Sequence, residues 1–324
     1  MKPRPTISVV VPTYNRAALI CETLDRILRQ TVPADEVIVV DDGSTDDTQA
    51  VLAQYGDQIK SIIIPNSGDL VARNVGMRAA SGQLVAFCDS DDLWELNFLE
   101  EMIWFWTSGP QPICSYCNFR LVHEEIWGQK LKFDQAPSGY WSDLTEPIDG
   151  HSYFRKPLVR KLIEFQPFFV SCLVADREQF LAIGGWDEGV SRKVGCDFAT
   201  TLRLAEHAPF GVLQKPLVGI RRHAGNISGN VQKMNLGDAE VLEYVLATRP
   251  GLKPYAAEIH QSVAQRRLDA FDTAFARRDF QSVKSTAKLL PQLKGARHAL
   301  KLVISSLPAP LRDIAWNLLT GRRA

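Results

Sequence analysis

The sequence lacks the features that mark a secreted, membrane-spanning or nucleic-acid-binding protein. No apolar run approaches the roughly 20 residues of a membrane-spanning helix, and residues 1–6 (MKPRPT) lead straight into a strand pattern rather than a signal peptide. The chain has no net charge, with 37 Lys and Arg against 37 Asp and Glu. The bulk charge therefore gives no reason to expect a nucleic-acid partner, and we expect a cytoplasmic protein.

The cysteines do not form a recognisable metal or disulfide framework. Cys114 and Cys117 make one CxxC pair, but no second pair or nearby His completes a zinc set. The pair also falls in residues 112–122, a run that reads as a strand. We expect core thiols rather than a metal or redox site, because the six cysteines are scattered and lie mostly in apolar stretches. They are Cys21, Cys88, Cys114, Cys117, Cys172 and Cys196.

What the chain does have is a globular composition with an uneven distribution of charge. Hydrophobic residues make up 45% of its 324 residues and charged residues 23%, which is typical of a folded protein. Residues 231–324 hold 15 Lys and Arg against 8 Asp and Glu, so this part carries +7 and the first 230 residues carry −7. We expect two regions, an acidic one over 1–230 and a basic, α-helical one over 231–324.

The first hundred residues alternate short apolar strands with helical patterns. Strands are predicted at 7–11, 36–40, 59–64 and 84–88, with helices at 17–30, 45–55 and 69–80. Strands joined by such crossovers pair in parallel, and ligands of these sheets bind at the carboxyl ends of the strands. An α/β fold follows, with its site at one edge of the sheet.

Polar clusters follow all four predicted strands. They are PTYNR at 12–16, DDGS at 41–44, NSG at 66–68 and DSDD at 89–92. Three carboxylates after an apolar strand would repel one another unless a divalent cation neutralises them. The alternative is that Asp91 or Asp92 caps a helix starting near Leu96. Asp41 and Asp42 allow a similar choice between a structural turn and hydrogen bonds to a nucleotide.

Four segments together resemble the family 2 glycosyltransferases of the GT-A fold. They are VVVPTYNR at 9–16, VDDGSTDDT at 40–48, ARNVG at 72–76 and FCDSDDLW at 87–94. Each is weak alone, but their order and spacing match the family, and the resemblance runs over about residues 7–228. It implies a Rossmann-like, mixed and mainly parallel sheet flanked by helices. It also implies transfer of a sugar from a nucleotide-diphosphate donor, most commonly UDP-linked, to an acceptor hydroxyl.

The resemblance assigns roles at the donor site. It implies that Asp91 is the principal ligand of Mn²⁺ or Mg²⁺ and that Asp89 contacts the ribose or the metal. Asp42 or Asp41 would read the base. Arg73 would contact the base or diphosphate unless it forms an ion pair on a helix surface. The remaining implied donor contacts are Pro12, Thr13 and Tyr14 of the first loop and Ser90, with Asp92 in support.

Downstream segments imply the catalytic and acceptor parts. GGWDE at 184–188 resembles the acceptor loop, which points to Gly185, Trp186 and Asp187. CDFATTLRLA at 196–205 resembles the segment with the catalytic Glu-Asp pair, but Cys196 stands in place of the glutamate. Asp197 falls on the aspartate, the general base of inverting members, unless it only caps its helix.

The closing motif of the family has a counterpart near the end of the resemblance. Arg222-His223, with Asn226-Ile227-Ser228, matches it, and His223 is implied as a ligand of the metal or diphosphate, although a lone His is normally structural.

The implied chemistry is an inverting substitution at the anomeric carbon, plausible in the synthesis of a cell-surface polysaccharide or glycolipid. One alternative is a sugar-phosphate nucleotidyltransferase, but such enzymes need a Gly-rich loop after the first strand, where PTYNR has no glycine. Another alternative is a non-catalytic sugar-nucleotide-binding or assembly protein, which the replacement by Cys196 favours.

The C-terminal segment 296–324 is amphipathic and basic. Apolar residues recur at helical spacing around Pro308 and Pro310. Such a segment suits an anionic membrane surface at the inner face of the membrane. Equally, it suits packing on the catalytic domain or on a second subunit of a homo-oligomer.

Overall fold

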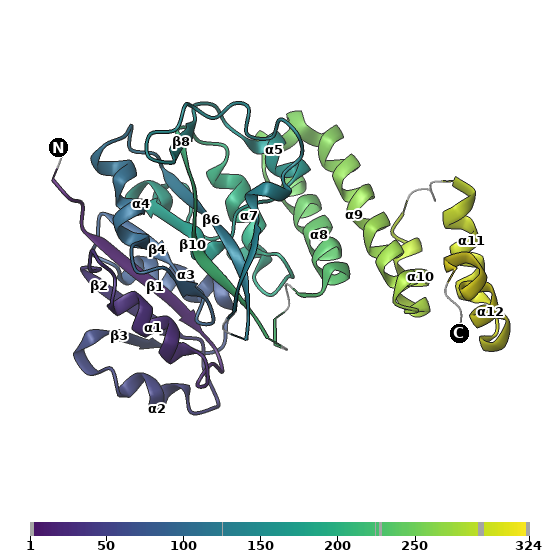
Figure 1. Cartoon of the computed structure of the whole chain (residues 1–324), viewed down its shortest axis with the longest axis horizontal. Coiled ribbons are helices and arrows are strands. Elements are labelled where there is room, and N and C mark those ends of the chain that lie inside the picture. The colour runs from purple at the N-terminus through teal and green to yellow at the C-terminus, as the bar shows by residue number, and fades with distance from the viewer. Residues whose placement is uncertain (1–2, 125, 224, 227–228, 291–294, 322–324) are drawn as a thin grey trace. The chain divides into compact units, whose positions relative to one another are not determined.

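The computed structural model describes residues 3–124, 126–223, 225–226, 229–290 and 295–321. The chain divides into two compact units (Figure 1). One comprises Met1–Arg192 and Cys196–Gly225, and the other Lys193–Gly195 and Asn226–Ala324. The predicted domain border at residue 230 stays a prediction, because a division into compact units does not test whether each unit folds independently.

The first unit is built on one ten-stranded sheet in the order β3-β2-β1-β4-β9-β6-β10-β5, with β7 beside β6 and β8 beside β10. The strands are β1 (Ile7–Thr13), β2 (Glu36–Asp41), β3 (Lys60–Ile63), β4 (Leu84–Phe87), β5 (Leu93–Trp94), β6 (Cys114–His123), β7 (Ile126–Leu131), β8 (His151–Phe154), β9 (Leu173–Asp176) and β10 (Phe210–Arg222).

Helices flank this sheet (Figure 1). They are α1 (Ile20–Leu28), α2 (Thr48–Ala53), α3 (Asp69–Ala79), α4 (Phe98–Thr107), α5 (Val159–Glu164), α6 (Arg177–Ala182) and α7 (Asp197–Leu204). Short 3-10 turns lie at Gly56–Gln58, Phe133–Gln135, Val170–Cys172 and Glu188–Val190. The predicted α/β class is confirmed.

The parallel part of the sheet lies where the alternating pattern predicted it. β1 pairs in parallel with β2 and with β4, and β2 pairs in parallel with β3. All seven residues of β1 are buried, because the strand has neighbours on both edges and helices against it. Further along the sheet, β9 runs antiparallel to β4 and β6.

Ser171 contributes to two local features beside the loop after β4. β9 begins at Leu173, directly after the 3-10 turn Val170–Cys172. The helix expected to start near Leu96 begins at Phe98 after Asn97, so neither Asp91 nor Asp92 caps it. In both places Ser171 takes part, because its hydroxyl and carbonyl bind Asp92 and the Trp94 indole.

The second unit is helical, as the sequence predicted. Its α-helices are α8 (Val231–Thr248), α9 (Ala256–Ala276), α10 (Phe280–Ala287), α11 (Gly295–Ser306) and α12 (Ala309–Thr320), with a 3-10 helix at Pro250–Tyr255. One face of α11 and α12 packs into a cluster with α9 and α10 that contains Phe275, Phe280, Ile304 and Trp316. Within the described residues, no helix is both long and apolar enough to cross a bilayer.

Candidate active site

The loops that follow β1 and β2 are tied together by hydrogen bonds. The backbone N–H of Asp42 donates to the carbonyl of Thr13 at 2.8 Å. Asn15 adopts a left-handed conformation (φ 52°), which Asn tolerates better than most residues. Its Oδ1 accepts from the N–H of Thr45 at 2.8 Å, while its own N–H donates to Ser44 Oγ at 2.9 Å. The segment 41–45 (DDGST) therefore shapes the loop after β1. Ser44 and Thr45 do not cap α2.

At the ends of β1 and β2, two buried oxygen atoms have no hydrogen-bond partner among the described residues. They are Thr13 Oγ1 and Asp41 Oδ2, and the two residues are neighbours in the β1–β2 register. Leaving such atoms unpaired costs free energy, and a bound ligand is one way to satisfy them. Tyr14, which follows, exposes 44% of its surface, whereas Pro12 is buried within β1.

Asp42 organises the third loop. Its two carboxylate oxygens accept from the backbone N–H groups of Ser67 at 2.6 Å and Gly68 at 2.8 Å. Gly68 has φ 98°, which an L side chain rarely adopts. Both oxygens of Asp42 are therefore paired, whereas Asp41 keeps one buried oxygen without a partner. The predicted contact between Asp42 and the base stays a prediction.

Arg73 lies at the centre of a buried ion-pair chain. From α3 its guanidinium donates to Asp69 and to Asp89, both at 2.6 Å, and it lies 5.1 Å from the ring centre of Trp186. Burial would lower the pKa of Arg73, but the charges of Asp89 and Asp69 raise it. The alternative of an ion pair on a helix surface is wrong, because only 4% of this side chain is exposed.

Asp92 is fixed inside the protein. Its carboxylate binds the hydroxyl of Ser171 at 2.5 Å and accepts from the backbone N–H of Arg221 at 3.1 Å. Ser171 Oγ also accepts from the N–H of Asp89 at 3.0 Å. Burial, Asp91 and Asp89 raise the pKa of Asp92 well above its ordinary value. Asp92 thus supports the loop rather than facing a ligand, while Ser90 is buried beside it.

Asp91 meets His223 across 132 residues of sequence, with Oδ2 and Nε2 2.9 Å apart. Arg16 Nε lies 3.5 Å from the same oxygen. No ready-made group of three or more metal-ligating side chains is found in the part of the chain that the structure describes. The carboxylate and imidazole still fit Mn²⁺ or Mg²⁺, because such ions characteristically take few protein ligands and complete their shell with substrate phosphates and water.

Asp89 does not join this pair in the present arrangement, since Arg73 holds its Oδ1. Burial raises the pKa of Asp89 and Asp91 adds to the rise, although the charge of Arg73 opposes it. Its position favours the predicted ribose contact over the predicted metal contact. The other members of the closing motif, Ile227 and Ser228, lie outside the described residues.

Asp197 is the first residue of α7, where the helix dipole stabilises a carboxylate. The N-cap position belongs to Cys196, which makes no capping hydrogen bond. Cys196 Sγ lies 3.6 and 3.8 Å from the two carboxylate oxygens of Asp69. Burial, followed by Asp69, raises the pKa of the Cys196 thiol. Cys196, the neighbour of Asp197 in the chain, is thereby linked through Asp69 and Arg73 to Asp89 after β4.

The prediction that Trp186 contacts the acceptor is wrong, because this side chain has a structural role. This indole is 1% exposed and packs edge-on against Phe87 and Phe180, so it leaves no face for an acceptor. Its backbone N–H and C=O bind the side chain of Asn74. Gly185 is needed there because a Cβ would come within 2.7 Å of Asn74 Oδ1.

Asp187, which belongs to the predicted acceptor loop, is the next candidate for the general base after Asp197. Its carboxylate accepts from Arg203 at 3.0 Å and from the N–H of Gly189 at 3.2 Å. An aspartate held by a guanidinium is a weaker proton acceptor, so Asp187 is less suited than Asp197.

Four residues of the site were not singled out from the sequence. Asp69, Ser171 and Arg16 carry no distinctive pattern, although Arg16 belongs to the PTYNR segment. Arg221 was visible only as the neighbour of Arg222-His223, yet its guanidinium contacts the carbonyl of Asp91 at 2.8 Å and Glu22 at 2.9 Å. These contacts join segments far apart in the chain, which sequence spacing does not reveal.

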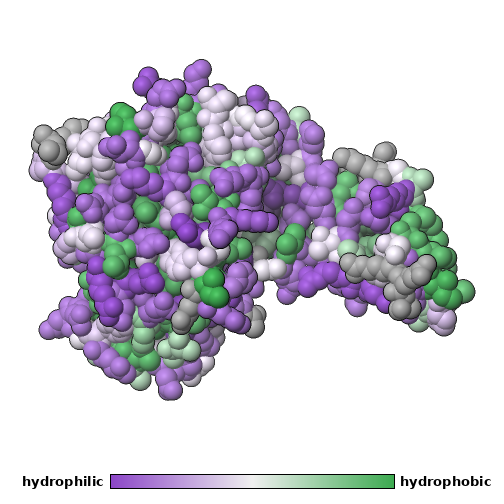
Figure 2. Space-filling view, in the orientation of Figure 1, coloured by the Kyte–Doolittle hydropathy of each residue, from purple (hydrophilic) through white to green (hydrophobic). Residues whose placement is uncertain are grey.

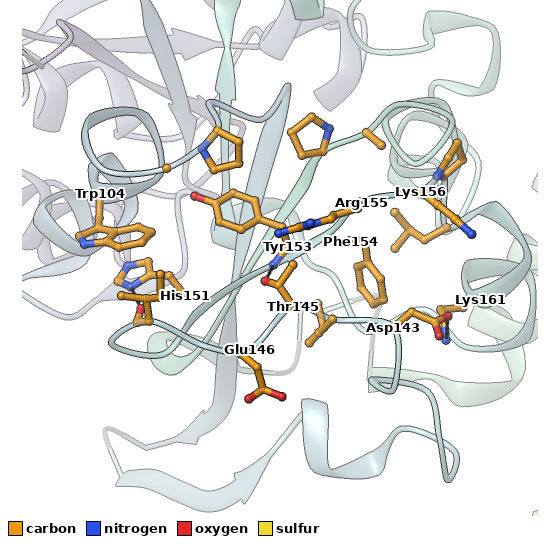
Figure 3. A pocket seen from close by; sticks show the side chains of 18 of the residues that line it. Trp104, Asp143, Thr145, Glu146, His151, Tyr153, Phe154, Arg155, Lys156 and Lys161 are labelled. Carbon is orange, nitrogen blue, oxygen red and sulfur yellow. Dashed lines mark hydrogen bonds and ion pairs between the residues drawn. The ribbon is translucent and has the colours of Figure 1, made fainter.

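A large pocket of about 1120 Å³ lies elsewhere on the first unit (Figure 3). Trp104 stacks on His151 there, and Lys161 pairs with Asp143 at 3.0 Å. The pocket includes Pro209, next to the start of β10, whereas Arg221 near the end of β10 contacts Asp91. The pocket and the Asp91 segment therefore lie toward opposite ends of β10. This pocket is thus separate from the donor edge.

Comparison with known proteins agrees with this geometry. Residues 8–163 match the model of "Glycosyl transferase family 2". Over 145 residues the chain is 42% identical to a putative teichuronic acid biosynthesis glycosyltransferase, TuaG, of Bacillus subtilis, covering 43% of this chain and 56% of that protein. Over 249 residues it is 31% identical to validoxylamine A glucosyltransferase of Streptomyces hygroscopicus, covering 69% and 58%. The chain thus spans little more than half the length of these relatives.

Solved structures show the same fold at low identity. S. aureus TarS 1–349, in complex with UDP, superposes with a TM-score of 0.57 at 19% identity, over 97% of this chain and 86% of that one. The mannosyltransferase PcManGT of Pyrobaculum calidifontis, in complex with GDP-Man and Mn²⁺, gives 0.55 at 19% identity, over 99% and 88%. The first unit therefore has the GT-A fold, and the chain contains a domain of glycosyl transferase family 2.

Proposed function

We propose that the chain is an inverting glycosyltransferase that moves a sugar from a UDP-linked donor to a hydroxyl of a glycan or glycolipid acceptor. The observation that carries this is the meeting of Asp91 and His223 at the sheet edge that also holds the unpaired oxygens of Thr13 and Asp41. The names of the relatives support a nucleotide-sugar donor, and that of TuaG supports a role in polysaccharide synthesis.

The donor's nucleoside would be held by the loops after β1 and β2. Asp41 accepts a hydrogen bond from a base N–H, Thr13 offers its hydroxyl, and the exposed ring of Tyr14 stacks on the base. Asp89, oriented by Arg73, accepts from a ribose hydroxyl. Thr13, Asp41 and Asp89 are already held by the fold, so ordering them for binding costs little conformational entropy.

Asp91 and His223 would hold Mn²⁺ or Mg²⁺, and Arg16 would contact the diphosphate. The chemistry that a bound cation supplies is neutralisation of the charge that grows on the departing nucleoside diphosphate. Asp197 takes the proton of the acceptor hydroxyl as its oxygen attacks the anomeric carbon. The bond to the diphosphate breaks as the new glycosidic bond forms, so the configuration inverts in a single displacement.

The non-catalytic alternative rests on Cys196 in place of the usual glutamate. Asp69 weakens that alternative, because it brings a carboxylate to Cys196 from α3. The nucleotidyltransferase alternative has no support from the loop after β1, where Asn15 takes the left-handed conformation without any glycine.

A panel of nucleotide sugars tests the proposal on the intact chain, with Mn²⁺ and with EDTA. A donor at 100 times its dissociation constant should stabilise the folded state by about 2.7 kcal/mol, which thermal unfolding detects. Release of nucleoside diphosphate only when metal is present would support an enzyme. Binding without any release or transfer would favour the sugar-nucleotide-binding alternative, and no binding by any donor would overturn the proposal.

A further inference from the structure

The two last helices of the second unit carry apolar side chains on both faces. The inner face packs into the cluster with α9 and α10, where the Trp316 indole also donates to the carbonyl of Phe275 at 2.8 Å. The outer face is Leu300 and Val303 of α11 with Leu311, Ile314 and Leu318 of α12, whose exposed fractions run from 45% to 80%.

The outer face is a continuous feature of the hairpin rather than scattered exposure. On α12 its residues follow the spacing i, i+3, i+7, which places them along one side of a helix. Figure 2 shows hydrophobic residues gathered over these C-terminal helices. Since the inner face is already filled, the outer face is not what holds the hairpin in its own unit. Exposed apolar patches of this kind mark contacts with a partner or a membrane.

The sequence that contains this face is rich in positive charge. Residues 284–324 contain eight Lys and Arg and a single acidic residue, Asp313. That aspartate is paired with Arg278 at 2.5 Å, so its charge is compensated. Arg297 is exposed on α11, and the sequence continues after α12 with Arg322 and Arg323.

We propose that the outer face docks on an anionic phospholipid surface. Apolar side chains enter the boundary between headgroups and acyl chains, while each Lys or Arg near an anionic surface strengthens binding. A second copy of this chain fits less well, because it would bring two strongly positive tails together. A nucleic acid would match the charge but not five exposed aliphatic side chains.

Vesicle flotation of the full chain, without any sugar donor, tests this. The probes are vesicles of phosphatidylcholine alone and vesicles with 30% phosphatidylglycerol, at low and at physiological salt. We expect flotation with the anionic vesicles only, weakened by salt. A triple variant of Leu311→Gln, Ile314→Gln and Leu318→Gln should lower the partition coefficient at least tenfold.

The matched control replaces three equally exposed apolar residues away from the hairpin, through Ile126→Gln, Ile148→Gln and Val231→Gln, and should float like the wild type. Circular dichroism of both triple variants verifies that they are folded. The proposal is overturned if the wild type does not float, or if the hairpin variant floats equally well. It is also overturned if sedimentation shows a dimer that the hairpin variant dissociates while vesicles are not bound.

Docking would bring the donor site to a membrane-bound acceptor, an extension that rests on the proposed function. The two can fail separately. Loss of donor hydrolysis with flotation intact would reject the transfer reaction alone, and hydrolysis of soluble donor with no flotation would reject the docking alone.

Discussion

The donor edge of the first unit and the C-terminal hairpin of the second unit depart from ordinary burial in opposite directions. At the donor edge, Asp41, Asp92 and Arg73 are buried. On the hairpin, Leu318 and its neighbours are exposed. Buried charge is costly unless paired, and exposed apolar surface forgoes the free energy of burial. The unpaired oxygen of Asp41 and the exposed outer face of the hairpin are therefore each an unfavourable arrangement that a partner would relieve.

The two regions differ in how the arrangement is maintained. The donor-edge carboxylates are held by Arg73, Ser171 and Arg221 from three separate segments. The outer face of the hairpin is held only from behind, by the cluster around Trp316. A substitution at the donor edge should therefore damage binding or chemistry, whereas one on the outer face should change docking and leave the fold intact.

Asp91→Asn should have the largest effect. The amide keeps the size of the side chain but removes the charge that would hold the cation, so we expect metal-dependent turnover to fall by about 10³-fold or more. Donor binding with and without Mn²⁺ is the measurement, and thermal unfolding verifies the fold. Asp57→Asn, at an exposed carboxylate of a 3-10 turn, is the control. Unchanged Mn²⁺-dependent affinity in Asp91→Asn would reject the metal assignment.

Asp197→Asn should affect chemistry and spare donor binding. Removing a general base typically lowers turnover by about 10²-fold or more, while the dissociation constant of the donor stays near that of the wild type. Steady-state transfer kinetics together with donor titration separate the two. Full activity in this variant would place the base elsewhere.

Asp69→Asn should act through Arg73, since it removes one of the two carboxylates that hold the guanidinium. We expect donor affinity to fall by roughly tenfold, as for other residues that orient ligand-binding groups. Adding Cys196→Glu should restore much of the loss, because the new carboxylate would start from the position that now contacts Asp69. A double variant no better than Asp69→Asn would show that α7 cannot supply this charge.

Leu318→Ala should have the smallest effect on stability. An exposed substitution usually changes the free energy of unfolding by less than about 0.5 kcal/mol. Trp316→Ala, two residues away on the inner face, is the contrasting control and should cost about 3–5 kcal/mol. Chemical denaturation measures both. A large loss in Leu318→Ala would mean that the outer face is part of the core after all.

Sequence patterns located much of the donor edge because its parts lie at strand ends. The alternation around β1, β2 and β4 predicted which residues would share that edge, and the structure brings the Asp91 and His223 segments together there. The prediction for Trp186 was wrong, because its motif suggested contact with the acceptor. The pattern does not show that its ring is enclosed by Phe87 and Phe180.

The same limit applies to the tail. The helical spacing of 296–324 predicted amphipathic helices and left open whether they pack on protein or meet a membrane. In the structure the apolar residues divide between an inner face packed within the second unit and an outer face left exposed. A spacing pattern predicts which residues share one side of a helix. It does not predict which sides pack against other elements.

The sequence by itself determined the α/β class, the polar edge of the sheet and the basic helical tail, because period, strand-end residues and charge are local properties of the chain. Only the tertiary structure decided that Arg73, Ser171 and Arg221 hold the carboxylates after β4 and that Asp41 keeps an unpaired oxygen. Those outcomes depend on contacts between residues as many as 130 positions apart. The topology of the sheet sets such contacts, and no local pattern encodes them.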